Sequence, residues 1–432
     1  MILEKLDFPL VATSANRSNE PIYRRYEQIQ ENLSDVVDVI LDINRDIVNA
    51  IDDSVVQVID GHIQTIRLGR GYGPMSIPLN FTVEKKVLAI GAQQKNTIAL
   101  ALNNTIILSP HIGDLHSIES FEYFERTIKT FENFYDFKAE QIVCDKHPSY
   151  VSRKWAKEQS IDTLEIQHHY AHVLACMIEH QLDEQVLAFS FDGTGYGDDG
   201  TIWGGEVMVC DYTNYKRIGH SKPFHILGGE KAIKEPCRMA LSMLFECYNF
   251  EKISEFTLPL LSEFTPKEVQ ILYQVWKKGI NSPLTSSIGR LFDIVASLMG
   301  ILHKSDYEGQ SGLLLESLCR DENARIFQYE IDDGIININL MITEIVDLVL
   351  ESNIDAIPDR FINTLIAIMD DFANNYLELP IVFSGGVFQN KILLQRAIKH
   401  FKAKGRRYYM QERTPINDGG ISLGQLAYAL KN

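Results

Sequence analysis

The stretch VLAFSFDGTGYGDDG (residues 186–200) is the strongest indication of the fold. In it, an apolar strand runs directly into a glycine-rich turn that holds three aspartates. A short apolar run that ends in such a turn predicts a buried strand. A similar junction stands earlier in the chain, where VLAIGA (87–92) leads into the polar turn QQKN. Glycines let backbone N–H groups approach phosphate oxygens, and carboxylates can hold the accompanying cation. Both junctions are therefore candidates for a ligand-facing edge.

The order of elements after each junction is the same. In the first half we expect strands at 97–102 and 105–109, a helix at 118–134, a strand at 141–145 and a helix at 171–182. In the second half we expect strands at 201–211 and 215–224, then a helix at 361–377, a strand at 380–386, a helix at 390–401, a short strand at 406–411 and a helix at 420–430. This repeated β-β-β-α-β-α order predicts an α/β class of protein with the duplicated actin-like (ASKHA or RNase H-like) two-lobe ATPase fold. Such a fold clamps a nucleotide between its lobes.

Three regions are expected along the chain. Residues 1–80 hold short β-like pieces, a charged helical segment near 23–33 and a Gly/Pro-rich run at 67–80 that predicts a linker or an extended crossing. Residues 81–185 form the first lobe. Residues 186–432 form the second lobe, with a helical insertion over about 232–321.

Composition excludes several classes of protein. The net charge of −17 disfavours nucleic acid as a partner, since binding to phosphates depends on Lys and Arg. The longest apolar runs are far shorter than the roughly 20 residues that cross a membrane, and the N-terminus has no secretory pattern. The six cysteines lack a CxxC pair, which indicates reduced thiols. We therefore expect a cytoplasmic protein that binds neither nucleic acid nor membrane.

The segment QHHYAH (167–172) predicts a metal site. If the helix that follows extends back through it, His168 and His172 lie one turn apart on the same face, where two imidazoles can reach one ion. His169 lies off that face, as a structural residue or a substrate contact. The alternative is a helix start with surface or capping histidines.

Two His ligands need a carboxylate partner. Asp192 and Asp418 each precede a glycine, and a carboxylate at the carboxyl end of a core strand points to the crevice where ligands of α/β folds bind. Both Asp-Gly pairs can also be ordinary turns. The ligand set suits iron or zinc, with Mg²⁺ as a further candidate near phosphates.

Other residues could hold a nucleotide. Gly385 and Gly386 join a strand to a helix, so backbone N–H groups there could approach it. Arg290 and Asp293 stand near the start of an apolar helix and could reach phosphate and ribose, respectively. Lys95 lies in the first hairpin turn. Each has an alternative without function. The two glycines could form an ordinary turn, Arg290 and Asp293 could belong to a core helix, and Lys95 could be an exposed lysine.

Together these segments resemble the HypF family of hydrogenase maturation carbamoyltransferases. The resemblance runs over almost the whole chain, through motifs in family order: TSAN, RGYGP, IGAQQKNT, SPHIGDL, CDKHPSY, QHHYAH, FDGTGYGDDGTIWGGE, GGEKAIKEPCR, SSIGRLFD, YEGQSG, VFSGGVFQN and PINDGGISLGQ. Residues from about 86 onward resemble the domain related to tRNA threonylcarbamoyl transferases. Residues 1–80 look like the C-terminal remnant of a YrdC-like domain.

The resemblance implies an ATP-dependent carbamoyltransferase. Its substrate is carbamoyl-adenylate, its partner a HypE-like acceptor protein whose C-terminal cysteine receives the carbamoyl group, and its product the precursor of the cyanide ligand of [NiFe]-hydrogenase. Three residues are implied to be catalytic: His168, His172 and Asp192. The implied metal ligands are these three and Asp418. The implied nucleotide-binding residues are Lys95, Asn96, Arg290, Asp293, Glu308, Gly385, Gly386 and Asn390, with Ser14 and Asn16 in the YrdC-like remnant.

The chain departs from the family pattern. The acylphosphatase-like domain, the zinc-finger region and most of the YrdC-like domain have no counterpart in this sequence, so we expect only the transfer half-reaction. Tyr170 stands where the family usually has a third histidine, off the ligand face.

Two other functions remain open: O-carbamoyl transfer to a small-molecule hydroxyl, and a non-catalytic ATP-binding scaffold.

Overall fold

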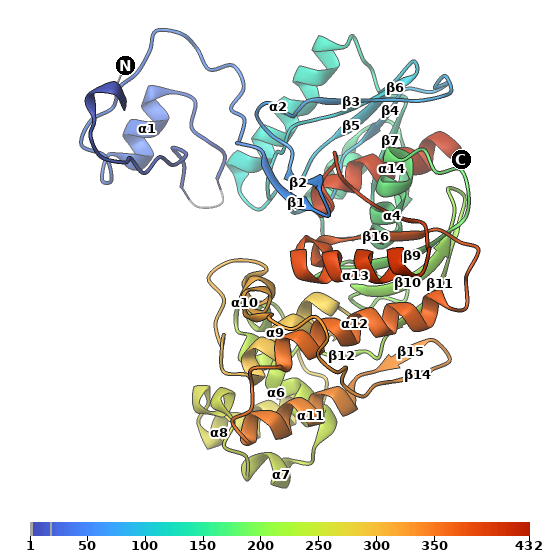
Figure 1. Ribbon diagram of the computed structural model, residues 1–432. Helices are drawn as coiled ribbons and strands as arrows, with labels where there is room; N and C mark the ends of the chain where they lie inside the picture. Colours follow the sequence, from blue (N-terminus) through green and yellow to red (C-terminus); the bar gives the residue numbers. More distant parts are fainter. Residues whose placement is uncertain (1–2, 18–19) are drawn as a thin grey trace.

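Two α/β lobes stand one above the other, with an extended N-terminal region beside the first (Figure 1). The structure is a computed structural model, and it describes residues 3–17 and 20–432. Among these residues no helix is long and apolar enough to cross a membrane.

The first lobe is built on a six-stranded sheet in the order β3-β6-β5-β4-β7-β8. Its strands are β3 (Met75–Pro78), β4 (Val87–Ala89), β5 (Ala99–Leu102), β6 (Thr105–Leu108), β7 (Gln141–Asp145) and β8 (Asp162–Ile166). Helices α2 (Ile118–Phe134) and α3 (Val151–Glu158) cover one face. Alternate residues of β4 and β5 point to the opposite face and pack on the C-terminal helix α14 (Ile421–Lys431), while α4 (His168–Glu179) packs between α14 and the second lobe.

The second lobe has a seven-stranded sheet in the order β14-β15-β11-β10-β9-β16-β17. Its strands are β9 (Val186–Phe191), β10 (Gly205–Cys210), β11 (Tyr215–Ser221), β14 (Glu330–Asp332), β15 (Ile335–Asn337), β16 (Ile381–Ser384) and β17 (Tyr408–Met410). On one face lie α12 (Ile357–Ala373) and α13 (Lys391–Ala403). On the other face, α4 and α14 (Ile421–Lys431) lie between the two sheets (Figure 1).

The insertion between β11 and α12 is mostly helical. It contains β12 (Phe224–His225), α5 (Glu230–Lys234), α6 (Pro236–Cys247), α7 (Phe250–Ser254), η2 (Pro259–Glu263), α8 (Pro266–Lys277), β13 (Leu284–Thr285), α9 (Ile288–Leu298), α10 (Gln310–Leu318), β14, β15 and α11 (Asn339–Leu350). Its apolar helix faces join the core of the second lobe.

The two lobes share one topology, which confirms the predicted duplicated fold. In each, three antiparallel strands come first, the fourth pairs parallel with the first, and the fifth pairs parallel with the fourth. The matched orders are β6-β5-β4-β7-β8 and β11-β10-β9-β16-β17. All six residues of β9 are buried, because helices cover both of its faces.

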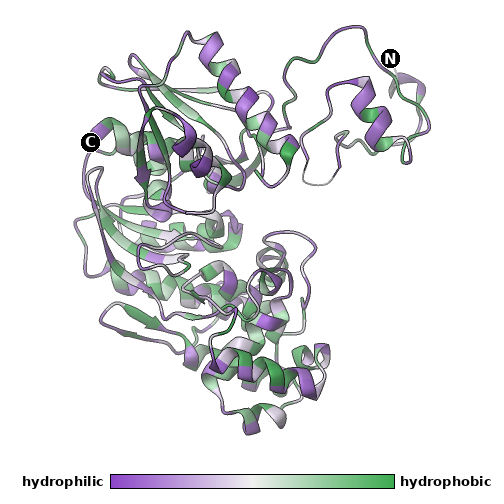
Figure 2. Ribbon diagram, turned by 180° about the vertical axis from the view of Figure 1, so that it is seen from behind, coloured by the Kyte–Doolittle hydropathy of each residue, from purple (hydrophilic) through white to green (hydrophobic). Residues whose placement is uncertain are grey.

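The N-terminal region contains η1 (Leu3–Lys5), α1 (Tyr26–Leu33) and the hairpin β1 (Val55–Ile59)–β2 (His62–Arg67). The hairpin rests on the second lobe, where Gln57 Nε2 donates to the Gln389 carbonyl at 2.9 Å and the Thr65 N–H donates to the Glu412 carbonyl at 2.8 Å. Figure 2 shows that α1 is mostly hydrophilic, in contrast to the strands of the two sheets.

The structure adds detail to the first lobe. The run at 67–80 is extended where β3 pairs antiparallel with β6 as the edge strand of the sheet, which agrees with the extended crossing expected as an alternative to a linker. The first lobe also contains α3 and β8, which the sequence analysis did not predict. Both are short, and β8 (DTLEI) is polar at alternate positions, as edge strands often are.

Candidate metal and nucleotide site

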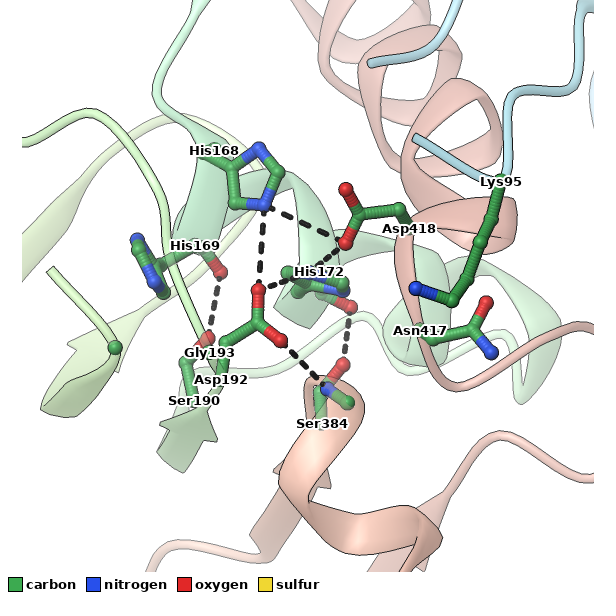
Figure 3. Close-up of polar contacts among 12 residues, drawn as sticks. Lys95, His168, His169, His172, Ser190, Asp192, Gly193, Ser384, Asn417 and Asp418 are labelled. Carbon is green, nitrogen blue, oxygen red and sulfur yellow. Dashed lines mark hydrogen bonds and ion pairs between the residues drawn. The ribbon is translucent and has the colours of Figure 1, made fainter. Parts of the chain in front are cut away.

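Four side chains of metal-ligand type converge between the lobes. Helix α4 begins at His168, so His168 and His172 project from the same face of its first turn. Asp192 directly follows β9, and Asp418 opens the short helix η4 (Asp418–Gly420) that leads into α14. One potential ligand atom from each lies within 4.8 Å of the others, as Figure 3 shows. The fold thus brings together four residues from three separate parts of the chain.

The distances in this cluster fit a shared ion. Asp192 Oδ2 lies 3.5 Å from the Nε2 atoms of both His168 and His172. Asp418 Oδ1 lies 3.8 and 3.6 Å from the same two nitrogens. Both histidines are fully buried, and neither Nε2 has a hydrogen-bond partner. Buried polar atoms without partners are costly, whereas two imidazoles and two carboxylates suit a divalent transition metal.

The two histidines of the cluster lower the pKa of one of its carboxyl groups, Asp192. Burial alone would raise the pKa of Asp192, but the adjacent His168 and His172 hold it well below its usual range. Burial lowers the pKa of His172, and Asp192 and Asp418 outweigh it, so the pKa lies above its ordinary value. The charges of the four groups are thus complementary.

The glycine turn after β16 holds Asp192 in place. The Gly386 N–H donates to Asp192 Oδ1 at 3.1 Å, which leaves Oδ2 directed at the histidines (Figure 3). Gly385 has a φ of 100°, and a Cβ on it would lie 2.3 Å from the Phe191 carbonyl oxygen. A Cβ on Gly386 would lie 2.8 Å from Asp192 Oδ1. The two glycines predicted to face a nucleotide therefore also shape the end of β9.

His169 packs beneath the glycine-rich loop. Its Nδ1 lies 3.2 Å from Gln167 Nε2, and a Cβ on Gly195 would lie 2.3 Å from its ring. Burial and the neighbouring His168 hold its pKa well below the ordinary value. His169 is thus a packing residue outside the cluster. Asp199 is also outside, since its Oδ1 accepts from Thr201 and Trp203.

Lys95 connects the two lobes. It lies in the first hairpin turn with a φ of 45°, and its Nζ is 2.5 Å from Glu308 Oε2 in the insertion of the second lobe. Burial would lower the pKa of Lys95, but Glu308 and Asp418 outweigh it, so the side chain stays charged. Figure 3 shows Lys95 beside Asp418. A charged lysine therefore lies near Asp418 of the cluster, and its predicted contact with a nucleotide stays a prediction.

Asn96, in contrast, does not face the crevice. It is fully buried, and its Nδ2 donates to the carbonyls of Ile90 and Ala92 at 2.8 and 2.6 Å. Its amide thereby closes the turn that presents Lys95. Its amide donors are therefore used within the turn, and the expected nucleotide contact of Asn96 stays a prediction.

The remaining predicted nucleotide residues lie on the second lobe. Arg290 Nη1 is 2.5 Å from Asp293 Oδ2, and Asp293 Oδ1 accepts from Ser311 at 2.6 Å. Burial raises the pKa of Asp293, and Arg290 opposes that rise. Asn390 caps α13 through the Leu393 N–H at 2.9 Å and donates to the Gly312 carbonyl at 3.1 Å. These residues join α9, α10 and α13.

Ser14 and Asn16 lie in the N-terminal region. Ser14 is exposed, and Asn16 Nδ2 donates to the carbonyls of Arg17 and Glu20 at 3.0 and 2.9 Å. Asn16 therefore stabilises a local turn. Their predicted nucleotide contact stays a prediction.

Asp145 was not among the predicted site residues, yet its Oδ2 lies 2.7 Å from His168 Nδ1. It is the last residue of β7. The rule that singled out Asp192, a carboxylate at the carboxyl end of a core strand, would also have found Asp145.

Three family models match the chain. One described as "Carbamoyltransferase, Kae1-like Domain, second subdomain" matches residues 188–425, and one described as "HypF Kae1-like domain" matches residues 82–179. A third, for the Sua5/YciO/YrdC family and described as "Telomere recombination", matches residues 1–69.

Curated relatives carry the name carbamoyltransferase HypF. The protein of Synechocystis sp. is 35% identical over 99% of this chain and 58% of its own length. That of Rhizobium leguminosarum bv. viciae is 34% identical over 97% of this chain and 55% of its own length. The chain thus spans little more than half the length of these relatives.

Two solved structures are similar over nearly the whole chain. A full-length HypF in the phosphate- and nucleotide-bound form has a TM-score of 0.94 and 38% identity, and the match covers 100% of this chain and 68% of that one. HypF of T. kodakarensis has a TM-score of 0.88 and 28% identity, over 97% of this chain and 56% of that one.

Proposed function

The chain belongs to the HypF carbamoyltransferase family, and on this premise we propose that it transfers a carbamoyl group from carbamoyl-adenylate to a HypE-like acceptor. The acceptor group is the thiol of the C-terminal cysteine, and the product leads to the cyanide ligand of [NiFe]-hydrogenase. The observation that carries the proposal is the convergence of His168, His172, Asp192 and Asp418 beside Lys95, between two lobes of nucleotide-clamping topology. The cytoplasmic location expected from the sequence belongs to the same proposal.

The reaction is an acyl transfer. The cysteine thiolate attacks the carbamoyl carbon, a C–S bond forms, the C–O bond to the adenylate phosphate breaks, and AMP leaves with the electron pair. Holding the two reactants in line is the principal task of the protein in such a step. The crevice between the lobes offers a fixed cation, Lys95, for the phosphate that becomes the leaving group.

The four converging residues would hold one divalent metal, iron or zinc. When bound, such a metal supplies Lewis acidity toward a carbonyl or phosphate oxygen. Asp192 is oriented by the Gly386 N–H, and the histidines keep their Nε2 lone pairs free of other partners. The histidine neighbours hold the pKa of Asp192 well below its usual range, which suits ligation by its carboxylate.

The nucleotide would lie across the crevice. Lys95 on the first lobe and Arg290 on the second supply charge, and the turn at Gly385–Gly386 allows close backbone approach. Asp293 and Glu308 are the carboxylates available to ribose hydroxyls or to a cation on the phosphates. The similar structure that contains phosphate and nucleotide supports this assignment.

The test supplies carbamoyl-adenylate and a HypE-like protein to the metal-loaded chain and measures the intact mass of the acceptor. We expect a carbamoyl adduct on the C-terminal cysteine, which is lost with His172→Ala and with Cys→Ala in the acceptor. An adduct on an added aminoglycoside hydroxyl instead would favour O-carbamoyl transfer. Binding of the acceptor without any adduct, in the presence of bound metal and nucleotide, would favour the scaffold.

A further inference from the structure

Asp145 is a buried carboxylate whose two oxygens have different partners. It is 1% exposed and ends β7, directly behind the metal cluster. Oδ2 lies 2.7 Å from His168 Nδ1. Oδ1 accepts a hydrogen bond from the His147 N–H at 2.8 Å. Both oxygens are therefore committed, and neither is one of the four atoms that face the ion site.

The contact with Asp145 decides which nitrogen of His168 can bind a metal. A neutral imidazole has one N–H donor and one acceptor nitrogen, while an ionised carboxylate only accepts. The proton of a neutral His168 must therefore be on Nδ1, toward Asp145. Its Nε2 then presents a lone pair toward Asp192 and Asp418, at 3.5 and 3.8 Å. His172 has no such support, because its Nδ1 has no hydrogen-bond partner.

We propose that Asp145 is a positioning residue that fixes His168 with its proton on Nδ1 and its Nε2 directed at the metal. The inference rests on the proposed metal site. A carboxylate behind a ligating histidine orients the ring and increases the basicity of the nitrogen that binds. Of the two proposed histidine ligands, His168 is thus the one whose ring is already oriented for the metal. A change that releases this ring should lower the affinity of the site for the metal.

The geometry makes Asp145→Asn a sharp test. The His147 N–H requires an acceptor, so the amide oxygen of the new side chain takes the place of Oδ1. Its NH₂ group must then face His168 Nδ1, so this nitrogen has to accept a hydrogen bond. The proton of His168 moves to Nε2, where it blocks the metal. The substitution keeps the size of the side chain and its contact with His147. Any change in metal affinity therefore reports the position of the His168 proton and not a change in packing.

A matched control exists on the surface of the second lobe. Asp370 Oδ1 lies 2.9 Å from His400 Nε2, a second aspartate–histidine pair that is remote from the cluster. Asp370→Asn makes the same chemical change and leaves the metal site untouched. Asp145→Glu keeps an acceptor for Nδ1 and serves as the conservative rescue.

The experiment measures Zn²⁺ affinity by chelator competition for the full chain and these three variants. We expect Asp145→Asn to bind Zn²⁺ about 10- to 100-fold more weakly than the wild type. Asp370→Asn should stay within about twofold, and Asp145→Glu should recover part of the loss. Thermal unfolding of each variant shows that it is folded.

A second measurement needs no variant of Asp145. Histidine-selective ¹⁵N labelling of the Zn²⁺-loaded wild type, with His168 assigned by His168→Gln, should show a protonated Nδ1 and a metal-bound Nε2. Metal on Nδ1, or a Zn²⁺ affinity of Asp145→Asn equal to that of the wild type, would overturn the inference and leave the metal site standing. A wild type that binds neither Zn²⁺ nor Fe²⁺ would overturn the metal site as well.

Discussion

His172 shows how much one side chain contributes to the site. It is fully buried, its two ring nitrogens have no hydrogen-bond partner, and two carboxylates lie within 3.6 Å of its Nε2. A group in that position costs stability unless something compensates for its lost hydration. Metal ligation would provide that compensation, so binding of the metal and folding should be linked.

We therefore expect His172→Ala to remove most bound metal and to abolish the metal-dependent rise in Tm. The measurement is metal content by mass spectrometry after dialysis, together with thermal unfolding with and without added Zn²⁺. A bound metal at 100 times its Kd would stabilise the wild type by about 2.7 kcal/mol.

His180→Ala is the control for that change. His180 follows the same helix, but its Nε2 contacts the Met410 carbonyl at 2.7 Å, away from the cluster. It should retain the full metal content. Equal metal content in His172→Ala and the wild type would contradict the assignment of His172 as a ligand.

Among the elements, α4 and α14 determine the relative positions of the four residues of the proposed metal site. The first carries His168 and His172, and the second follows Asp418. The helices cross at Gly424, where an added Cβ would lie 1.8 Å from the Ala171 carbonyl oxygen. Only a glycine permits this approach, and the approach places Asp418 opposite the histidines.

Gly424→Ala should separate the two helices. We expect a loss of about 1–3 kcal/mol in the free energy of unfolding, typical of overpacking, and a weaker affinity for Zn²⁺. Denaturant unfolding and chelator competition measure the two effects.

Gly312→Ala is the matched control. Gly312 also lies in a helix, but the atom nearest to an added Cβ would be 3.8 Å away. It should be neutral or slightly stabilising, and an equal loss in both variants would rule out the helix crossing as the cause.

A second pair of helices, α12 and α13, is joined by a charge pair that depends on pH. Asp359 is 2% exposed, and its Oδ1 lies 2.5 Å from Arg396 Nη2. Burial raises the pKa of Asp359, but hydrogen bonds from the Arg320 N–H and Arg396 lower it below its ordinary value. A carboxyl group whose pKa is lower in the folded state stabilises the protein above the unfolded pKa, about 3.9.

The stabilisation by Asp359 should therefore be present at neutral pH and lost as the pH falls below about 4. We expect Asp359→Asn to lower Tm at pH 7, and the difference from the wild type to shrink toward pH 3. Thermal unfolding at several pH values measures this. A difference that stays constant across that range would show that the charge of Asp359 contributes nothing.

At the scale of the whole molecule, the repeated strand order could be predicted because it depends on long apolar runs that are buried in both lobes. The convergence of His168, His172, Asp192 and Asp418 followed from the same order, since each stands next to a strand or helix end. Helix α3 and strand β8 were not predicted, because eight and five residues are too short for their apolar pattern to repeat, although α3 has a distinct apolar face. The buried role of Asn96 could not be predicted either, because its partners are backbone carbonyls that no side-chain pattern reveals.

The contact between Lys95 and Glu308 joins the lobes, and it leads to a prediction about the molecule as a whole. The pair is partly exposed, so it contributes at most about 1 kcal/mol to stability. A nucleotide that spans the crevice would contact Lys95 on one lobe and Arg290 on the other. Lys95→Ala should therefore barely change the Tm of the ligand-free chain, yet lower its affinity for ATP at least about tenfold, since the contact of its charge with a phosphate is lost.

Calorimetric titration with ATP and the ATP-dependent rise in Tm measure this effect. Lys399→Ala is the matched control, because Lys399 forms a comparable 2.7 Å pair with Glu322 on the outer surface. It should bind ATP as the wild type does. If Lys95→Ala keeps the full affinity and the full rise in Tm, the nucleotide does not reach the first lobe at Lys95. The lobes would then be joined by protein contacts alone, and ATP would bind to the second lobe without drawing the two together.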